Sequence, residues 1–341
     1  MRLGIICPSE IALRRFMPAL TKVKEIEFVG VAVCNYEERF GLTSRNKDKI
    51  TEVLKNEYEK AKFFIDSYGG KIFDGYENIV TSDEIDVLYV PLPPALHYIW
   101  SAKALDFGKH VIVEKPATIC VDDTKKLIDI ANNKELVLHE NYMFLFHKQI
   151  EEINEIIKSG ELGDIRLYRI TFGFPRRALE DFRYNKELGG GALIDAGGYV
   201  LKYAAALLGD TAKVMYAQLN YDNKLDVDIY GSGAVINSMG VVAQIAFGMD
   251  NEYKCELEVW GSKGELTTNR ILTAPVGYTP TIIIRKDNKD YIKQLSKDDT
   301  FEKSIRHFEK SVNDNSIRTN NYQNILKQAK LVEEFKQLAK K

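Results

Sequence analysis

Apolar runs alternate with segments of helical spacing through the first 140 residues. The runs are continuous and rich in β-branched residues, which is typical of strands covered on both faces. They lie at residues 2–7, 26–34, 85–94, 110–116 and 136–143. Helical patterns follow three of them, at 11–20, 97–107 and 121–133, and Ser9 is placed to cap the first helix. This order predicts βαβ units, and hence a doubly wound parallel sheet over residues 1–142.

The second half of the chain has a different pattern, in which apolar and polar residues alternate with a period of two. The alternating segments lie at 164–174, 241–247, 255–261 and 279–285, and a helical pattern rich in Lys and Glu follows over 320–340. Alternation of this kind predicts a mostly antiparallel sheet with one face open and helices on the other. We therefore expect a second, α+β domain over 143–341. The polar segment 44–62 is expected to form an exposed helical insertion in the first domain.

Composition and charge exclude several classes of protein. The 47 Lys and Arg residues nearly balance 49 Asp and Glu residues, for a net charge of −2. A chain of this charge lacks the basic surface of a nucleic-acid binder or of a protein that adheres to anionic membranes. The four cysteines, Cys7, Cys34, Cys120 and Cys255, are too widely spaced for a zinc site or a disulfide framework. With no signal peptide or long apolar stretch evident, a cytoplasmic location without a membrane segment is expected.

Ligands of doubly wound sheets bind beyond the carboxyl ends of the strands. The first such end is Cys7-Pro8-Ser9-Glu10-Ile11, where a dinucleotide phosphate loop would have glycine at positions 7 and 9. Ser9 carries a Cβ at the point where pyrophosphate approaches the backbone. Its hydroxyl and the helix N-terminal amides are nevertheless able to bind phosphate. By itself, the loop is weak evidence for a dinucleotide.

Two further segments point to a reaction centre. Glu114-Lys115-Pro116 follows a buried strand, so Lys115 is expected at the ligand-facing edge, where it can bond a substrate oxygen and offset negative charge. The segment 188–201, LGGGALIDAGGYVL, surrounds Asp195 and Tyr199 with glycines. Such glycine density indicates a backbone that approaches a ligand closely.

Together, these segments resemble the glucose–fructose oxidoreductase/inositol dehydrogenase-type (Gfo/Idh/MocA) oxidoreductases over nearly the whole chain. The matching motifs are Gly4-Ile5-Ile6, Pro93 with Leu96-His97, Gly108-Lys109-His110-Val111, Glu114-Lys115-Pro116, Asn141-Tyr142-Met143, Gly160-Glu161-Leu162-Gly163, Gly189 to Leu193 and Asp195-x-Gly197-x-Tyr199. The resemblance implies a Rossmann domain, a sheet domain that often makes homo-oligomer contacts, and hydride transfer between NAD or NADP and a sugar carbon.

The resemblance also assigns roles to residues. Lys115 and Tyr199 would be catalytic, the tyrosine replacing the histidine that many members carry, as in the branch that resembles sugar 3-ketoreductases. A phenol, whose pKa is ordinarily about 10, needs a nearby cation for acid–base work near neutrality. The expected substrate-binding residues are Asp195, Arg183 and His147. The expected cofactor-binding residues are Cys7, Ser9, Glu10, Ile11, Asn35, Pro93, His97 and Glu114.

Several departures from the family pattern leave alternatives open. Cys34-Asn35 offers no carboxylate for a ribose diol, and Arg39 or Arg45 could reach a 2′-phosphate, so NAD and NADP both remain possible. His97 and His147 also have a purely structural interpretation. Arg176, Arg177, Arg183 and Lys186 form either a solvated face or a site for a phosphorylated or nucleotide-linked sugar.

The sequence therefore predicts an NAD(P)-dependent oxidoreductase that reduces a keto-sugar or a nucleotide-linked sugar, with Tyr199 as proton donor and Lys115 assisting it. A catalytically silent sensor on the same fold is the alternative, because the phosphate loop is degraded. A glycosidase that recycles bound NAD is a third possibility.

Overall fold

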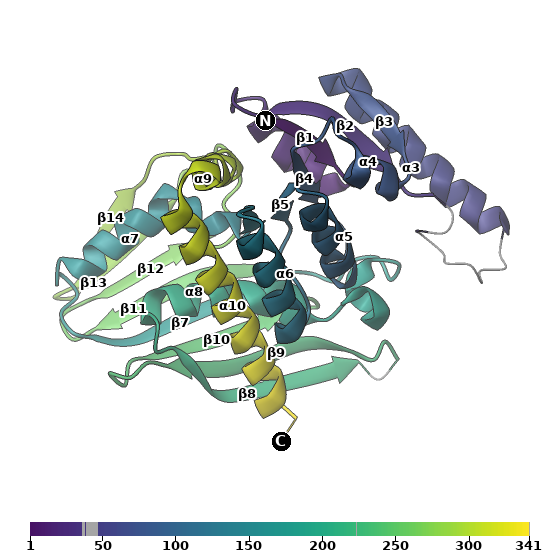
Figure 1. The fold of residues 1–341 in the computed structure, drawn as a ribbon. Coiled ribbons are helices and arrows are strands. Elements are labelled where there is room, and N and C mark those ends of the chain that lie inside the picture. Colours follow the sequence, from purple (N-terminus) through teal and green to yellow (C-terminus); the bar gives the residue numbers. More distant parts are fainter. Residues whose placement is uncertain (36–37, 39–46, 223, 341) are drawn as a thin grey trace. The chain divides into compact units, whose positions relative to one another are not determined.

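The computed structural model describes residues 1–35, 38, 47–222 and 224–340. The chain forms two compact units (Figure 1). Unit 1 contains Met1–Thr118, Asp122–Asn141 and Ser304–Ile325, and unit 2 contains Ile119–Val121, Tyr142–Lys303 and Leu326–Lys341. The predicted boundary at residue 142 does not anticipate the return of Ser304–Ile325 to unit 1. The assignment of separate roles to the two domains stays a prediction.

Unit 1 is built on a six-stranded parallel sheet of strand order β3-β2-β1-β4-β5-β6. The strands are β1 (Arg2–Ile5), β2 (Glu27–Val33), β3 (Lys71–Asp74), β4 (Val87–Val90), β5 (His110–Val113) and β6 (Leu138–Glu140). This order is that of the dinucleotide-binding Rossmann fold, with its switch point between β1 and β4. The predicted doubly wound sheet is confirmed. Sequence reasoning missed β3, a four-residue edge strand with only one buried side chain.

The helices of unit 1 are those that connect its successive strands, together with parts of two helices from the end of the chain. They are η1 (Ala12–Phe16), α1 (Met17–Leu20), α3 (Lys47–Tyr68), α4 (Tyr76–Thr81), α5 (Pro94–Asp106) and α6 (Val121–Asn133), with much of α9 (Thr300–Asn313) and the first part of α10 (Asn315–Leu338). Ser9 caps the first helix as predicted, because its Oγ accepts the N–H of Ala12 at 3.2 Å. Gly108, with φ of +76°, follows α5.

The segment expected as an exposed insertion over 44–62 is instead the crossover helix α3 between β2 and β3. It packs on both of these strands, and Ala61 and Phe64 are buried. The carboxylate of Glu57 is buried as well and accepts three hydrogen bonds: from the Cys34 N–H at 3.0 Å, the Cys34 thiol at 2.9 Å and the Tyr76 hydroxyl at 3.1 Å. The segment is polar in composition, so its buried face could not be predicted from the sequence. Positions 44–46 lie outside the described residues.

Unit 2 is built on an eight-stranded sheet of order β14-β13-β12-β11-β7-β10-β9-β8, in which only the β7–β10 pair is parallel. The strands are β7 (Ile165–Gly173), β8 (Lys213–Asp222), β9 (Val227–Ile236), β10 (Val242–Gly248), β11 (Lys254–Gly261), β12 (Glu265–Asn269), β13 (Thr281–Lys286) and β14 (Lys289–Gln294). The predicted mostly antiparallel sheet is confirmed. Sequence reasoning missed β8, β9, β12 and β14.

Helices cover one face of this sheet. They include α7 (Lys148–Lys158) and α8 (Gly198–Leu208), which continues the π-helical turn η5 (Leu193–Gly197) and packs on β7, β9 and β10 (Figure 1). Short 3₁₀ turns precede them: η2 (Met143–Phe146), η3 (Phe182–Tyr184) and η4 (Lys186–Leu188). Tyr168, Ile170 and Phe172 of β7 are buried, whereas Arg169 between them is exposed. The period-two pattern therefore reflects one covered and one open face.

The stretch Lys186–Leu208 is long and apolar enough to cross a membrane by length and composition. The sequence had suggested no such stretch. However, 78% of its apolar window is buried inside the protein, and α8 lies within the core of unit 2. We therefore interpret the stretch as a core helix.

The Glu57 cluster generates a stability prediction. Glu57→Ala leaves the buried N–H of Cys34 and the hydroxyl of Tyr76 without their acceptor, so the free energy of unfolding should fall by about 2–4 kcal/mol. Urea unfolding of the purified variant measures this change. Glu59→Ala, an exposed glutamate on the same helix, is the matched control and should change stability by less than about 0.5 kcal/mol. Equal effects of the two substitutions would contradict the buried role of α3.

Candidate active site

The carboxyl end of β1 presents a helix N-terminus at the switch point of the sheet. Ser9 lies beyond it, and the backbone N–H groups of Glu10 and Ile11, at the start of the helix, make no hydrogen bond within the described part of the chain. These orphan donors are what a phosphate requires. Cys7 is half-buried, and its thiol donates to the carbonyl of Pro91 at 3.5 Å. The loop after β1 is thereby joined to the loop after β4.

The end of β2 holds a carboxylate that sequence reasoning missed. Glu38 accepts the N–H groups of Asn35 at 2.8 Å and of Tyr76 and Glu77, both at 2.9 Å. Asn35 in turn accepts the N–H of Glu38 through its side-chain oxygen. Glu38 therefore caps α4 and orders the loop that holds Asn35. Arg39 and Arg45, considered for a 2′-phosphate, lie outside the described residues.

His97 joins the loops that follow β4 and β5. Its imidazole is fully buried, with Nε2 2.7 Å from the carbonyl of Leu92 and Nδ1 2.7 Å from the carbonyl of Pro116. Both ring nitrogens are thus engaged with backbone. The structure therefore favours the structural interpretation of His97 over direct cofactor binding. Through the carbonyls of Leu92 and Pro116, the residue supports the neighbouring Pro93 and Lys115.

The strand β5 ends in Glu114–Lys115. The Glu114 carboxylate accepts hydrogen bonds from the Tyr89 hydroxyl and from the Asn141 side-chain amide, each at 2.7 Å. Burial raises the pKa of Glu114, against these two hydrogen bonds, which lower it. Lys115 is partly exposed at the same edge. Lys115 therefore lies just beyond the carboxyl end of β5, and its role at a ligand site stays a prediction.

Tyr199 lies on α8 of unit 2 inside a group of aromatic rings. Its ring centroid is 5.4 Å from those of Tyr142 and Phe172, both nearly edge-on, and 5.7 Å from that of Phe144. The Tyr199 hydroxyl lies 4.0 Å from the sulfur of Met143. Packing of this kind leaves the phenol one position. Lys202, one turn further along, places its ammonium 5.1 Å from the centroid of the Tyr142 ring.

Arg183 and Asp195, both expected to bind substrate, form an ion pair. The Arg183 Nε donates to an Asp195 carboxylate oxygen at 2.5 Å, and its Nη1 donates to Asp181 at 3.1 Å. Burial alone lowers the pKa of Arg183, but the carboxylates of Asp195 and Asp181 outweigh it and raise the pKa above its ordinary value. Asp195 precedes Tyr199 by one helical turn. Arg183 therefore anchors the beginning of this helix, and its charge is already balanced by two carboxylates.

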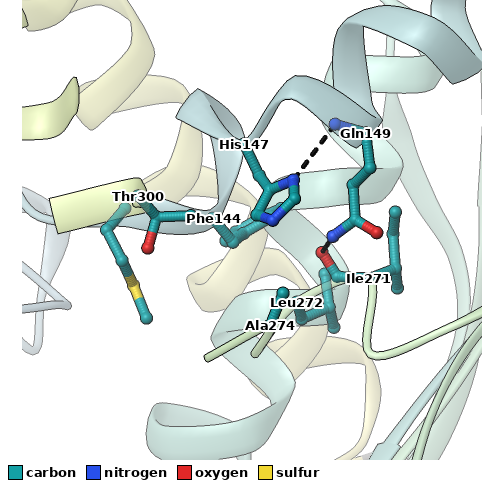
Figure 2. A pocket seen from close by; sticks show the side chains of 8 residues that line it. Phe144, His147, Gln149, Ile271, Leu272, Ala274 and Thr300 are labelled. Carbon is teal, nitrogen blue, oxygen red and sulfur yellow. Dashed lines mark hydrogen bonds between the residues drawn. The ribbon is translucent and has the colours of Figure 1, made fainter. Parts of the chain in front are cut away.

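His147 lines a small hollow within unit 2 (Figure 2). The His147 Nδ1 accepts the N–H of Gln149 at 3.1 Å, which places the ring proton on Nε2. That Nε2 and the Oε1 of Gln149 have no hydrogen-bond partner among the described residues. Phe144, which packs on Tyr199, also lines the hollow. Burial lowers the pKa of His147, so its ring is a neutral donor.

Comparisons with known proteins agree with this arrangement. Residues 24–142 match the family description "Oxidoreductase family, NAD-binding Rossmann fold", and residues 150–267 match the GFO/IDH/MocA C-terminal domain. The chain is 34% identical to dTDP-3,4-didehydro-2,6-dideoxy-alpha-D-glucose 3-reductase of Actinomadura kijaniata, over 98% of this chain and 94% of that protein.

The chain belongs to the GFO/IDH/MocA oxidoreductase family.

Further matches within this family cover the chain end to end. A protein of the same name from Streptomyces violaceoruber is 32% identical over 99% of this chain and 95% of its own length. The crystal structure of a 3-ketoreductase from A. kijaniata in complex with NADP and TDP-benzene superposes with a TM-score of 0.89, at 33% identity, over 99% of this chain and 97% of that one.

The family assignment settles the coarse predictions. The resemblance to GFO/IDH/MocA proteins, the two-part fold, the oxidoreductase class and a nicotinamide dinucleotide as cofactor are confirmed. The individual site residues stay predictions. In unit 1, the structure gathers Cys7, Ser9, Pro93, Glu114 and Lys115 at the carboxyl ends of β1, β4 and β5. In unit 2, it joins Asp195 to Arg183.

Sequence reasoning missed the polar partners of these residues: Glu38, Tyr89, Asn141 and Asp181. Only Asp181 had a local signal, because its side chain accepts the N–H of Arg183 two residues on and caps a 3₁₀ turn. Glu38 lies three residues from Asn35, whereas Tyr89 and Asn141 lie 25 and 27 positions from their partner Glu114.

The burial of His97 gives a pH prediction. Burial lowers its pKa to about 4, against the two carbonyl oxygens, which favour the charged ring. Since the unfolded residue titrates near 6.5, the neutral ring contributes stability above pH 6.5 that is lost as the pH falls toward 4. The full contribution is about 3 kcal/mol.

Urea unfolding at pH 7 and pH 4.5 tests this expectation. The wild-type protein should lose more stability on acidification than His97→Gln, whose side chain does not titrate. A wild-type protein that loses more stability than the variant as the pH rises would instead show that the two carbonyls keep the ring charged.

Proposed function

We propose that this protein is an NADP-dependent ketoreductase that reduces the 3-keto group of a nucleotide-linked deoxysugar. The observation that carries the proposal is the fixed Tyr199 phenol, held by Tyr142, Phe144 and Phe172 at the start of α8. Relatives that match the chain along its whole length are named for reduction of a dTDP-linked keto-sugar, and one of them was solved with NADP. These names support the choice of substrate class and cofactor.

The dinucleotide is proposed to bind at the carboxyl edge of the sheet in unit 1. The orphan N–H groups of Glu10 and Ile11, with the Ser9 hydroxyl beside them, fit a diphosphate. Asn35, Pro93 and Glu114 border the same edge, with Cys7 at the end of β1. His97 supports the loops from inside the protein. When bound, the nicotinamide supplies the hydride for a carbonyl carbon.

Tyr199 and Lys115 complete the reaction. In the direction of reduction, Tyr199 donates a proton to the carbonyl oxygen of the substrate as the carbon receives a hydride, so that ketone, NADPH and a proton yield alcohol and NADP⁺. The ammonium of Lys115 stabilises the negative charge that develops on the oxygen. The carboxylate of Glu114, fixed by two hydrogen bonds, holds the strand end from which Lys115 projects.

Substrate contacts are proposed on unit 2. His147 presents an Nε2–H with no partner among the described residues, which suits a substrate oxygen. Asp195, ordered by Arg183, suits a substrate hydroxyl. Arg176 lies within 3.7 Å of two aspartates and Lys186 pairs with a third. Arg177 is exposed beside the Phe174 ring, and no ion pair is found for it within the described ranges, so we assign it to the diphosphate of the substrate.

The open face of the sheet in unit 2 supports a homo-oligomer. Trp260 is half-exposed there, and Arg169 pairs with Glu258 and bonds Gln244 from neighbouring strands. A large aromatic residue bordered by ordered charge pairs fits a second copy of the same face. We also propose a cytoplasmic location, which the wide spacing of the four cysteines along the sequence supports.

Substitution of the two catalytic candidates tests the mechanism. Tyr199→Phe and Lys115→Ala should each lower kcat by at least about 10²-fold on a dTDP-linked 3-keto-sugar with NADPH, because each removes a group that acts in the transition state. The control is Tyr203→Phe, one turn further along the same helix. Its buried hydroxyl has no hydrogen-bond partner among the described residues, so kcat should stay near that of the wild type. Near-wild-type turnover in either catalytic variant refutes the assigned role.

Cofactor choice is tested by fluorescence titration with NADPH and with NADH, after the purified protein has been checked for resident cofactor. We expect micromolar binding of NADPH and weaker binding of NADH. Tighter binding of NADH reverses the cofactor assignment. Absence of both binding and resident cofactor contradicts the enzyme proposal and favours a silent sensor.

A further inference from the structure

A buried chain of hydrogen bonds continues beyond Glu114 into the C-terminal part of unit 1. Glu114 is bonded to Asn141 at 2.7 Å, Asn141 to Ser304 at 2.8 Å, and Ser304 to His139 at 2.8 Å. Asn141, Ser304 and His139 are each less than 4% exposed. We propose that Ser304 is a positioning residue for Lys115, acting through Asn141 and Glu114. This inference rests on the proposed function in assigning a catalytic role to Lys115.

The direction of each hydrogen bond in the chain is determined by chemistry. The Glu114 oxygen that Asn141 contacts also accepts the Tyr89 hydroxyl, so Asn141 turns its NH₂ group toward Glu114 and its oxygen toward Ser304. The Ser304 hydroxyl donates its one hydrogen to that oxygen. The His139 Nε2 must then be the donor to Ser304. Because no member can reverse its role alone, the serine fixes the amide, and the amide fixes the carboxylate.

The serine comes from the segment that returns to unit 1 late in the chain. Asn141 is the last residue of the unit before the chain leaves it, and Ser304 is the first residue on its return. Asn141 and Ser304 are therefore hydrogen-bonded to each other. Through Glu114, they are also connected to the end of β5, which Lys115 follows. Loss of the Ser304 hydroxyl leaves the buried Asn141 oxygen without this donor and frees the amide to rotate. The Glu114–Lys115 turn then has one fewer fixed support.

A matched control separates this role from general stabilisation of α9. Ser311 lies on the same helix, is fully buried, and donates its hydroxyl at 2.6 Å to the carbonyl of Phe308 in that helix. Ser304→Ala and Ser311→Ala thus remove the same group from the same buried helix. Only the first is bonded to the Glu114 chain.

Steady-state kinetics with NADPH and a dTDP-linked 3-keto-sugar compare the two variants. Ser304→Ala should lower kcat about tenfold, with KM for both substrates within about twofold of wild type, because about 1.4 kcal/mol of transition-state stabilisation is lost. Ser311→Ala should keep the wild-type kcat. Equal kcat values in the two variants, or a Ser304→Ala effect confined to KM, would overturn the positioning role.

A second measurement does not depend on turnover. The rate at which acetic anhydride modifies Lys115 is followed by mass spectrometry in wild type, Ser304→Ala and Ser311→Ala. We expect a change of at least about twofold in Ser304→Ala alone, since a lysine whose support is loosened changes its reactivity. If the wild-type protein shows no reductase activity, the proposed function fails, and this labelling still decides whether Ser304 positions Lys115.

A further variant covers the case in which alanine prevents folding. Ser304→Cys is close to serine in size and has only a weak S–H donor. It should reproduce the lowered kcat and the changed labelling in part. Wild-type values for both in the cysteine variant would overturn the proposal.

Discussion

Strands of a parallel sheet that is covered on both faces end inside the protein, and every polar group at those ends needs a partner. In unit 1, four side chains meet part of this need. Glu57 accepts bonds at the end of β2, His97 lies between the loops after β4 and β5, and Glu114 and Asn141 join the ends of β5 and β6. Water satisfies such groups in an exposed loop. At this edge, protein side chains supply many of these partners.

The groups that hold this edge differ from Lys115, the proposed catalytic group beside them. One oxygen of the Glu114 carboxylate accepts two hydrogen bonds, and both ring nitrogens of His97 face backbone carbonyls. Lys115 directly follows Glu114 in the sequence and is partly exposed. A single charged group that projects from a fixed backbone is placed with little loss of conformational entropy, which is what transition-state stabilisation requires.

In unit 2, aromatic packing and an ion pair surround Tyr199, the other proposed catalytic residue. Aromatic packing fixes the ring of Tyr199, and an ion pair between Arg183 and Asp195 fixes the first turn of its helix. Both devices depend on tight packing around α8. At Gly198, a Cβ would lie 2.4 Å from the Tyr142 hydroxyl, so the glycine is required for close approach rather than for flexibility. At this position, the glycine-rich segment serves packing of the helix against Tyr142.

The sequence by itself determined the order of the elements and the type of each sheet. Continuous apolar runs predicted the parallel sheet, period-two alternation predicted the antiparallel one, and the motifs around Lys115 and Tyr199 predicted the family. These signals are local, because they depend on which face of a strand or helix is covered. Short or edge elements such as β3 gave no such signal, since four residues with one buried side chain have no measurable period.

Only the tertiary structure decided which residues hold the site together. Glu57 belongs to a segment that is polar by composition, and Ser304 lies 163 positions from its partner Asn141. The sequence placed Arg183 in a basic cluster that suits a phosphate, yet in the structure two carboxylates balance its charge. A hydrogen bond between distant residues depends on how the chain folds back on itself. The pattern of a sequence therefore shows where a polar residue lies along an element, and only the folded chain shows what that residue bonds.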